Sequence, residues 1–152
     1  MFVKTKKIIY FLISLSLLFL GGIIYIRYRS HSLNMFGLLR ALNLEKFFPQ
    51  HYFNKNSIIQ SFIVFSLPNG LWYLSAIMIF SLIWKQNKPF YFYSTIFLIF
   101  NILTEVLQLN HIVSGTFDSV DIFVLVISHF MGLTINYFWS KGVMYEKESE
   151  NC

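Results

Sequence analysis

Three carboxylates and an amide are the residues of this chain best placed to do chemistry. Glu105 and Gln108 lie near the end of one apolar stretch, and Asp118 and Asp121 open the next. A carboxylate within a membrane segment is energetically expensive, so its presence indicates a specific role. We take Glu105 as the candidate catalytic acid or base, or ligand, oriented by Gln108. Asp118 and Asp121 are candidates to bind a substrate hydroxyl group, an amine or a cation.

A third polar segment is expected at the same place. Residues 66–70, with the sequence SLPNG, interrupt the second apolar stretch, and the predicted topology brings them to the face that carries the carboxylates. Asn69 is therefore a further candidate for substrate binding. The four histidines are scattered, and the single cysteine is the terminal Cys152. Neither a metal site nor a cofactor is expected from this pattern.

Each of these residues also has a structural interpretation. Asp118 and Asp121 have the spacing of an N-cap and an N3 residue, where carboxylates also suit the helix dipole. For Asp118 considered alone, the helix-capping role is the favoured interpretation. Capping does not explain Glu105. A structural role, as a buried carboxylate bonded to Gln108 or to the backbone, is as well supported by the sequence as a functional role. His129, alone in a later apolar stretch, is more typical of a hydrogen-bonded packing residue than of a ligand.

Composition indicates a membrane protein. Of the 152 residues, 56% are hydrophobic and 12% are charged, whereas a soluble domain carries about 25% charged residues. The net charge of +5 comes from basic residues beside the apolar runs. Basic residues there anchor and orient membrane spans, so no nucleic-acid partner is expected. The expected partner is the lipid bilayer, and the sequence identifies no protein partner.

Four apolar stretches predict an all-α fold, an integral membrane bundle of four transmembrane helices. Each approaches the roughly 20 residues that cross the hydrocarbon core. The first is longer than the apolar region of a signal peptide, about 7–15 residues, so it is expected to be retained. The chain is then one membrane domain, 1–152, with spans at 8–26, 66–84, 90–109 and 120–139, a polar segment at 27–57 and a charged tail at 140–152.

Two features of the chain interrupt this simple pattern. The polar segment 27–57 mixes charged and apolar residues, which is consistent with an interfacial amphipathic helix, a lid or a packed loop. Proline suits the first turn of a helix and disrupts its interior, so the second span is predicted to begin near Pro68. Residues 62–65 would then dip at the interface or re-enter the membrane.

The distribution of basic residues predicts the orientation. The side with the termini is expected to carry seven of them, and the other side five. The bias favours a multi-pass protein of the plasma (inner) membrane with cytoplasmic termini and the hairpin 108–118 outside. The two sets are Lys4, Lys6, Lys7, Lys85, Lys88, Lys141 and Lys147, and Arg27, Arg29, Arg40, Lys46 and Lys55.

Polar and small residues form a stripe along each of the last two predicted helices. Such stripes face protein rather than lipid. Helices joined by a short hairpin pack side by side, so the two stripes are expected to face each other. Glu105 would lie roughly 22 Å along its helix from Phe90, in the outer third of the membrane. The stripes are Asn101, Thr104, Glu105 and Gln108, and Asp121, Ser128, Gly132 and Asn136.

Two motifs and a glycine carry a family resemblance over about residues 67–136. They are an ExxQ helix end (Glu105 to Gln108), the GTFDxxD turn (Gly115 to Asp121) and Gly132. In these residues the chain resembles the VanZ-like family of small bacterial membrane proteins. That family often has an arginine in the hairpin, and an asparagine four residues and a glycine seven residues after the second aspartate. Here the hairpin has no arginine, and Leu125 and Ser128 stand at the other two positions.

The resemblance implies a cellular location rather than a particular reaction. The VanZ-like family is linked to glycopeptide resistance and to the bacterial cell envelope. The carboxylate cluster would then bind or process an envelope lipid or glycan at the outer face. The alternative is a non-catalytic membrane subunit or accessory protein whose polar residues are helix-packing and capping groups. An ion pathway is less favoured, because the stripes carry few ionisable groups, and whether the protein is an enzyme stays open.

Overall fold

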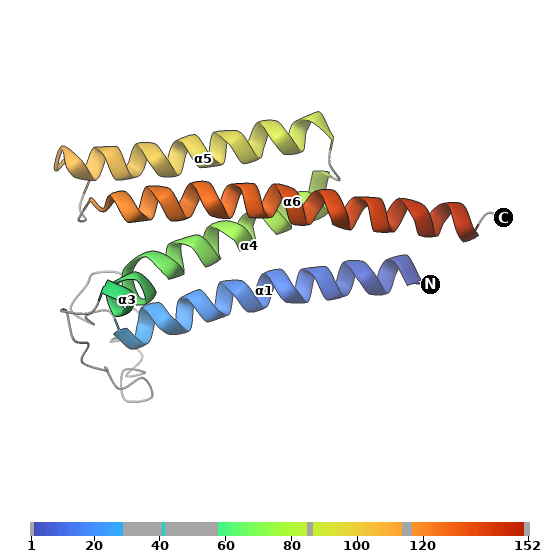
Figure 1. Ribbon diagram of the computed structural model, residues 1–152, viewed down its shortest axis with the longest axis horizontal. Coiled ribbons are helices and arrows are strands. Elements are labelled where there is room, and N and C mark those ends of the chain that lie inside the picture. Colours follow the sequence, from blue (N-terminus) through green and yellow to red (C-terminus); the bar gives the residue numbers. More distant parts are fainter. Residues whose placement is uncertain (1, 29–40, 42–57, 85–86, 114–116, 151–152) are drawn as a thin grey trace.

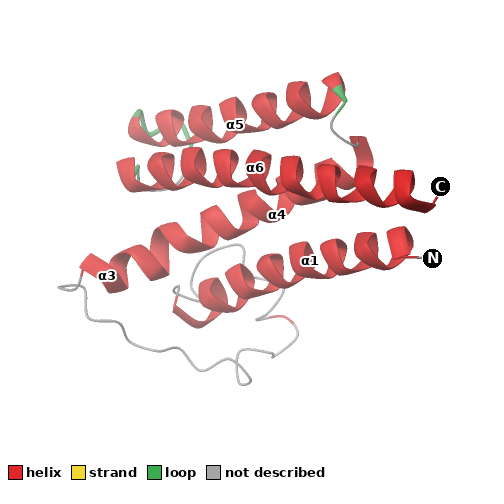
Figure 2. Cartoon of the chain, turned by 45° about the vertical axis from the view of Figure 1, so that its right-hand side comes forward, coloured by secondary structure: helices red, strands yellow, loops and turns green. Residues whose placement is uncertain are grey.

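Helices make up nearly all of the described structure. The computed structural model describes residues 2–28, 41, 58–84, 87–113 and 117–150, and Figure 2 shows no strand among them. A short helix, α3 (Ile58–Ser61), and a π-helical turn, η3 (Phe62–Ser66), lead directly into α4. The four longest helices are α1 (Phe2–Tyr28), α4 (Leu67–Trp84), α5 (Lys88–Leu109) and α6 (Ser119–Glu150).

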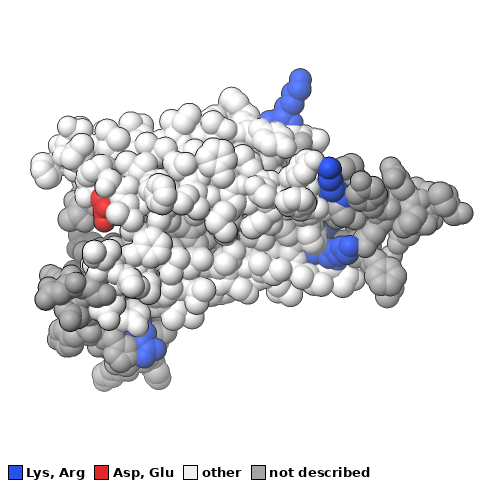
Figure 3. Space-filling view, in the orientation of Figure 1, with Lys and Arg blue, Asp and Glu red and all other residues white. Residues whose placement is uncertain are grey.

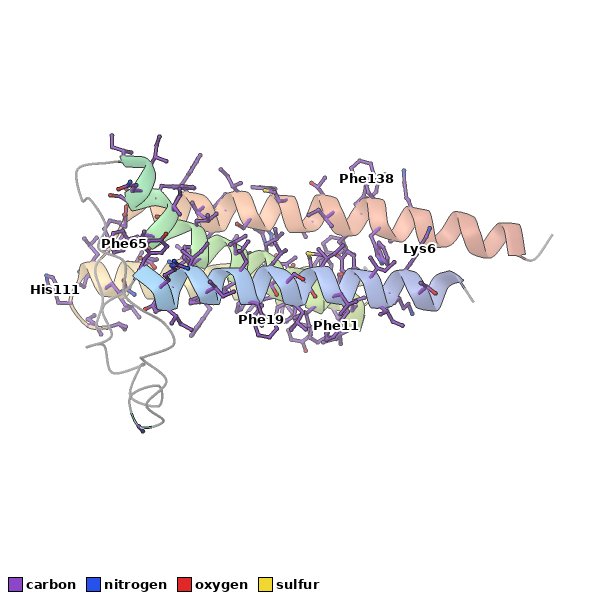
Figure 4. The ribbon with its side chains drawn as sticks, turned by 90° about the horizontal axis from the view of Figure 1, so that it is seen from below. Lys6, Phe11, Phe19, Phe65, His111 and Phe138 are labelled. Carbon is purple, nitrogen blue, oxygen red and sulfur yellow. The ribbon has the colours of Figure 1, made fainter. Side chains whose placement is uncertain are left out.

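Four helical segments are long and apolar enough to cross a membrane, which confirms the predicted all-α fold with four helices of transmembrane length. They are Thr5–Tyr28, Ile58–Trp84, Lys88–Leu109 and Ser119–Lys141. Large apolar side chains such as Phe19 and Phe138 point outward from the helices (Figure 4). A lipid bilayer is the surrounding that suits such a surface. The polar segment predicted at 27–57 lies almost wholly outside the described residues.

Helix α4 is the central element of the bundle. It crosses obliquely between α1 and α6, while α5 lies along α6 (Figure 1). Half of the α4 span is buried, as against 17% of the spans of α1 and α5 and 33% of that of α6. Both termini lie at one end of the bundle, and the turn between α5 and α6 and the helix α3 lie at the other (Figure 1). This arrangement brings the start of α4 to the same end as the α5–α6 turn.

The regular α-helix α4 begins at Leu67, next to Pro68 as predicted, but residues 62–65 neither dip nor re-enter, because the segment before α4 is also helical. The helix runs from Ile58 to Trp84 without a break, and residues 62–65 are part of it. The chain takes a π-helical turn immediately before the proline, in which the Leu67 N–H donates to the Phe62 carbonyl. A proline ring clashes with the carbonyl four residues earlier in a regular α-helix. The wider turn relieves that clash, so the second span gains eight residues at its N-terminal end.

Close approach and hydrogen bonds join α1 to α4. A Cβ atom built on Gly21 would lie 2.7 Å from Nε1 of Trp72, so only glycine fits there. The same indole N–H donates to the Leu18 carbonyl at 3.1 Å. Deeper in the bundle, the Ser75 hydroxyl donates to the Ser14 carbonyl at 2.7 Å. Small residues and interhelical hydrogen bonds are the usual means by which helices associate in lipid.

Most of the polar stripe of α6 faces α4, which corrects the expected pairing of the two stripes except at its outer end, where the charge of Asp121 acts on Glu105 of α5. A Cβ atom on Gly132 would lie 2.6 Å from Cγ2 of Ile77. One on Gly70 would collide with Val124 and lie 2.9 Å from the Ser128 hydroxyl oxygen. The two helices therefore meet at glycines that each contributes. Sequence order suggested α5 as the partner, but the obliquely crossing α4 lies closer to the small residues.

These contacts predict different outcomes for two glycine substitutions. Gly132→Ala should lower stability by about 1–3 kcal/mol, because the added methyl group overpacks the contact with Ile77. Gly22→Ala is the matched control, since no atom lies within 4 Å of a Cβ atom built there. The control should be neutral or slightly stabilising because alanine favours the helix. SDS titration of the purified proteins measures both, and equal stability of the two variants would contradict the assigned α4–α6 contact.

Candidate functional site

Three acidic residues come together where α5 ends and α6 begins, and Asn69 of α4 joins them. We call Glu105, Asp118 and Asp121 the acidic cluster. Glu105 and Asp121 are buried, with exposed fractions of 8% and 6%, and Asp118 is half-buried. The three helices that the sequence predicted to gather at this face do meet there.

Asp118 is the N-cap of α6. Its Oδ1 atom accepts the Val120 N–H at 2.9 Å, and its carbonyl accepts the Asp121 N–H at 3.0 Å. The predicted capping role of Asp118 is confirmed. Asp121 is in the first turn of α6, where the partial positive charge of the helix terminus stabilises a carboxylate.

Glu105 ties the end of α5 to the start of α6. Its carboxyl group accepts a hydrogen bond from the backbone N–H of Asp118. That N–H is one of the donors that a helix N-terminus leaves unpaired, and here a neighbouring helix supplies the acceptor. The second oxygen, Oε2, is buried and has no hydrogen-bond partner among the described residues.

Asn69 connects α4 to the acidic cluster. Its Nδ2 atom donates to Oδ2 of Asp121 at 3.1 Å. The neighbouring Gly70 makes this possible, because its missing side chain lets α4 approach Val124 and Ser128 of α6. Asn69 was predicted as a substrate-binding residue, and the structure places it in the site as a partner of Asp121.

Gln108 and His111 lie outside the inner part of the site. Gln108 was expected to orient Glu105, but it donates no hydrogen bond to the buried Oε2 atom. His111 follows α5 with a φ of 56°, and it donates its N–H to the Gln108 carbonyl at 3.0 Å. The Ile112 N–H reaches the Leu107 carbonyl, also at 3.0 Å. These bonds form a Schellman motif that ends α5, and the His111 side chain points away from the helices (Figure 4).

The charge around Glu105 is negative. The charges that act on its carboxyl group are those of Asp121 and Asp118. On the face that Figure 3 shows, acidic atoms lie at one end of the molecule and most described basic atoms lie toward the other. A buried anion is stable only when it is paired or hydrogen-bonded. The site therefore favours a partner that brings positive charge or hydrogen-bond donors.

A second polar group lies deeper, between α4, α5 and α6. The Tyr73 hydroxyl lies 3.0 Å from Nδ1 of His129 and donates to the Ser94 carbonyl at 3.4 Å. Both contacts are satisfied together when Nδ1–H donates to the tyrosine oxygen. His129 is thus a hydrogen-bonded packing residue, in line with the sequence interpretation. Tyr73 was missed, because a tyrosine in an apolar stretch gives no signal of its partner.

Asn136 is a further buried polar residue on α6. Its exposed fraction is 2%, and its Nδ2 atom has no hydrogen-bond partner within the described ranges. An amide is neutral, so this burial costs much less than that of an ionised carboxyl group. Asn136 is fifteen residues beyond Asp121 along α6, about 22 Å, and so does not belong to the acidic cluster.

The chemistry open to the acidic cluster follows from its groups. A carboxylate with a spare oxygen accepts a hydrogen bond, holds a cation or exchanges a proton. Within the described residues, no three side chains of the metal-ligating types come together closely enough to hold a metal ion. The arrangement is therefore best suited to a ligand that donates hydrogen bonds.

No family model, curated protein or solved structure matches this chain. The VanZ-like resemblance stays a prediction that rests on the motifs of the sequence. Any functional argument depends on that resemblance and on the geometry of the acidic cluster.

The buried Tyr73–His129 contact predicts a loss of stability when the hydroxyl group is removed. Tyr73→Phe should destabilise the protein by about 1 kcal/mol, because the buried His129 Nδ1 loses its partner. Tyr91→Phe makes the same chemical change at an exposed position of α5, so its stability should stay within about 0.5 kcal/mol of the native value. SDS titration compares the three proteins. Identical midpoints would show that the hydrogen bond contributes nothing.

Proposed function

We propose that this chain is a VanZ-like protein of the bacterial plasma membrane that binds the polar head group of an envelope lipid or lipid-linked glycan at the acidic cluster. Two features support the proposal. The ExxQ and GTFDxxD motifs resemble those of that family. The same motifs supply all three carboxylates of the cluster, which gather at one end of a bundle of membrane-spanning helices.

The buried Oε2 atom of Glu105 is the observation that carries the proposal. Buried polar atoms in folded proteins are nearly always hydrogen-bonded, and a carboxylate is the most expensive group to leave without a partner. Here the neighbouring charges are also negative. A carboxyl group held in this way is suited to a ligand that supplies the missing donor.

Each residue of the site has its own part in this function. Glu105 contacts the ligand through Oε2 and is the candidate acid or base if a reaction follows. Asp121 adds negative charge and is held by Asn69. Asp118 fixes the start of α6 and leaves one carboxyl oxygen beyond its capping bond. Glu105 is the site's principal contact with the ligand. The other residues set the position of the Glu105 side chain and the electrostatic field around it.

A specific observation also favours the second function, a non-catalytic membrane subunit. Glu105 accepts the Asp118 N–H, and Asp121 accepts from Asn69. In this alternative both carboxylates serve to fasten helix ends together. It assigns no ligand to Oε2, and it predicts that the neutral amide of Glu105→Gln is tolerated.

Lipids that purify with the protein distinguish the two functions. Lipid extracts from the purified native protein should contain a species that Glu105→Gln loses at unchanged protein yield, because the amide removes the charge that holds the head group. Thr104→Val is the control, since among the described residues the Thr104 hydroxyl bonds only to the Phe100 carbonyl of its own helix. Mass spectrometry compares the three extracts. The same lipids in all three would refute binding at Glu105 and support the subunit function.

Cysteine labelling tests directly which side of the membrane carries the acidic cluster. Ile112 is 70% exposed in the turn between α5 and α6, and Cys152 is the only native cysteine. In intact cells, a membrane-impermeant maleimide should label Ile112→Cys at position 112 and leave Cys152 unlabelled until the cells are opened. Labelling of Cys152 alone would invert the orientation and require a cytoplasmic ligand.

A further inference from the structure

The carboxyl oxygens that the site leaves open are hydrogen-bond acceptors. Glu105 offers Oε2, and Asp118 offers the oxygen that does not cap α6. Asn69 donates one amide N–H to Asp121, which holds that carboxylate beside them. A ligand that meets Glu105 and Asp118 must therefore bring donors.

The ligand must also bring positive charge. Glu105, Asp118 and Asp121 are all acidic, and the charges that act on Glu105 come from the two aspartates. Acidic residues in a cluster do not by themselves make a site. The independent observation is Glu105 itself, a carboxyl group that is 8% exposed and whose Oε2 atom has no partner in the described part of the chain.

Among cations, the geometry favours an ammonium group over a metal ion. Calcium takes six to eight oxygen ligands and magnesium demands an octahedron, whereas no three metal-ligating side chains of the described residues lie close enough to one another to hold a metal ion. A primary ammonium group has three N–H donors and is satisfied by two or three acceptors. A quaternary ammonium group has no N–H, so it would leave Oε2 of Glu105 without a hydrogen bond.

We propose that the acidic cluster binds a primary ammonium group, which donates to Oε2 of Glu105 and is held by the charges of Asp118 and Asp121. This inference rests on the proposed function and names the chemical class of its ligand. Glu105 is four residues from the end of α5, which places it about 6 Å inside the helix end. The head group of an aminophospholipid and a soluble primary amine share this ammonium chemistry.

The test measures how fast a hydrophobic carbodiimide modifies Glu105 in the full-length protein. The reagent adds to carboxylic acids from the lipid phase, and a bound ammonium ion covers the carboxyl group and keeps it ionised. The protein is placed in nanodiscs of phosphatidylcholine, alone or mixed with phosphatidylethanolamine. The two lipids differ in the methyl groups on nitrogen. Peptide mass spectrometry reports modification of Glu105 separately from that of Asp121.

The expected result is slower modification of Glu105 in discs that contain phosphatidylethanolamine, by about tenfold when roughly nine sites in ten are occupied. Ethanolamine, with choline as its control, is added to phosphatidylcholine discs to test a soluble source. Protection by ethanolamine without protection by the lipid supports the ammonium site and assigns it a soluble amine. Equal rates under all of these conditions overturn the proposal.

Two further measurements separate this inference from the proposed function. Protection by magnesium ions and not by amines would refute the ammonium ligand while leaving an acidic binding site in place. The proposed function would be refuted as well only if the Glu105→Gln extract contained the same lipids as the native extract. Asp118→Asn should keep the helix cap, because asparagine caps as well as aspartate. It should weaken the protection by phosphatidylethanolamine several-fold, and unchanged protection would exclude Asp118 from the site.

Discussion

Close contact between the backbones of α4 and α6 is the constraint on which the rest of this structure depends. Lipid is as apolar as the helix surfaces, so burial of apolar side chains does not draw two helices together in a membrane. Packing and hydrogen bonds must do so, and both require short distances. Gly70 and Gly132 supply them, since neither position has room for a Cβ atom. The same contact brings Asn69 within 3.1 Å of Asp121, so the packing of the helices builds the site.

The polar groups inside the bundle fall into two kinds. In the interior, the Tyr73 hydroxyl has His129 and the Ser94 carbonyl as partners, and Ser75 bonds to the Ser14 carbonyl. Such groups fasten helices together without a ligand. At the end of the bundle, one oxygen of the Glu105 carboxyl group accepts the backbone N–H at the start of α6. The other oxygen is buried and has no hydrogen-bond partner among the described residues. This difference distinguishes Glu105 from the hydrogen-bonded Tyr73 and Ser75, which only hold the fold.

The structural and functional roles of Glu105 are compatible, because they use different oxygens. Through one oxygen the side chain accepts the backbone N–H at the start of α6, which holds the carboxyl group in one position. A ligand that meets the second oxygen then finds an acceptor that is already oriented. Preorganisation of this kind reduces the entropy lost on binding. The capping contact thus favours a ligand site as much as it favours a structural role.

The sequence by itself determined the elements and the chemical nature of the site. Long apolar runs predicted the four spanning helices, since every backbone polar group in lipid must be satisfied within the helix. Asp118 was identified as an N-cap because capping depends on residues only a few positions apart. The tertiary structure alone decided which helices face each other. In the tertiary structure most of the polar stripe of α6 packs against α4, and His129 pairs with Tyr73. A π-helical turn before Pro68 also keeps the chain helical there. These outcomes depend on helix crossing angles and on contacts between distant residues, and the order of residues along one chain does not encode them locally.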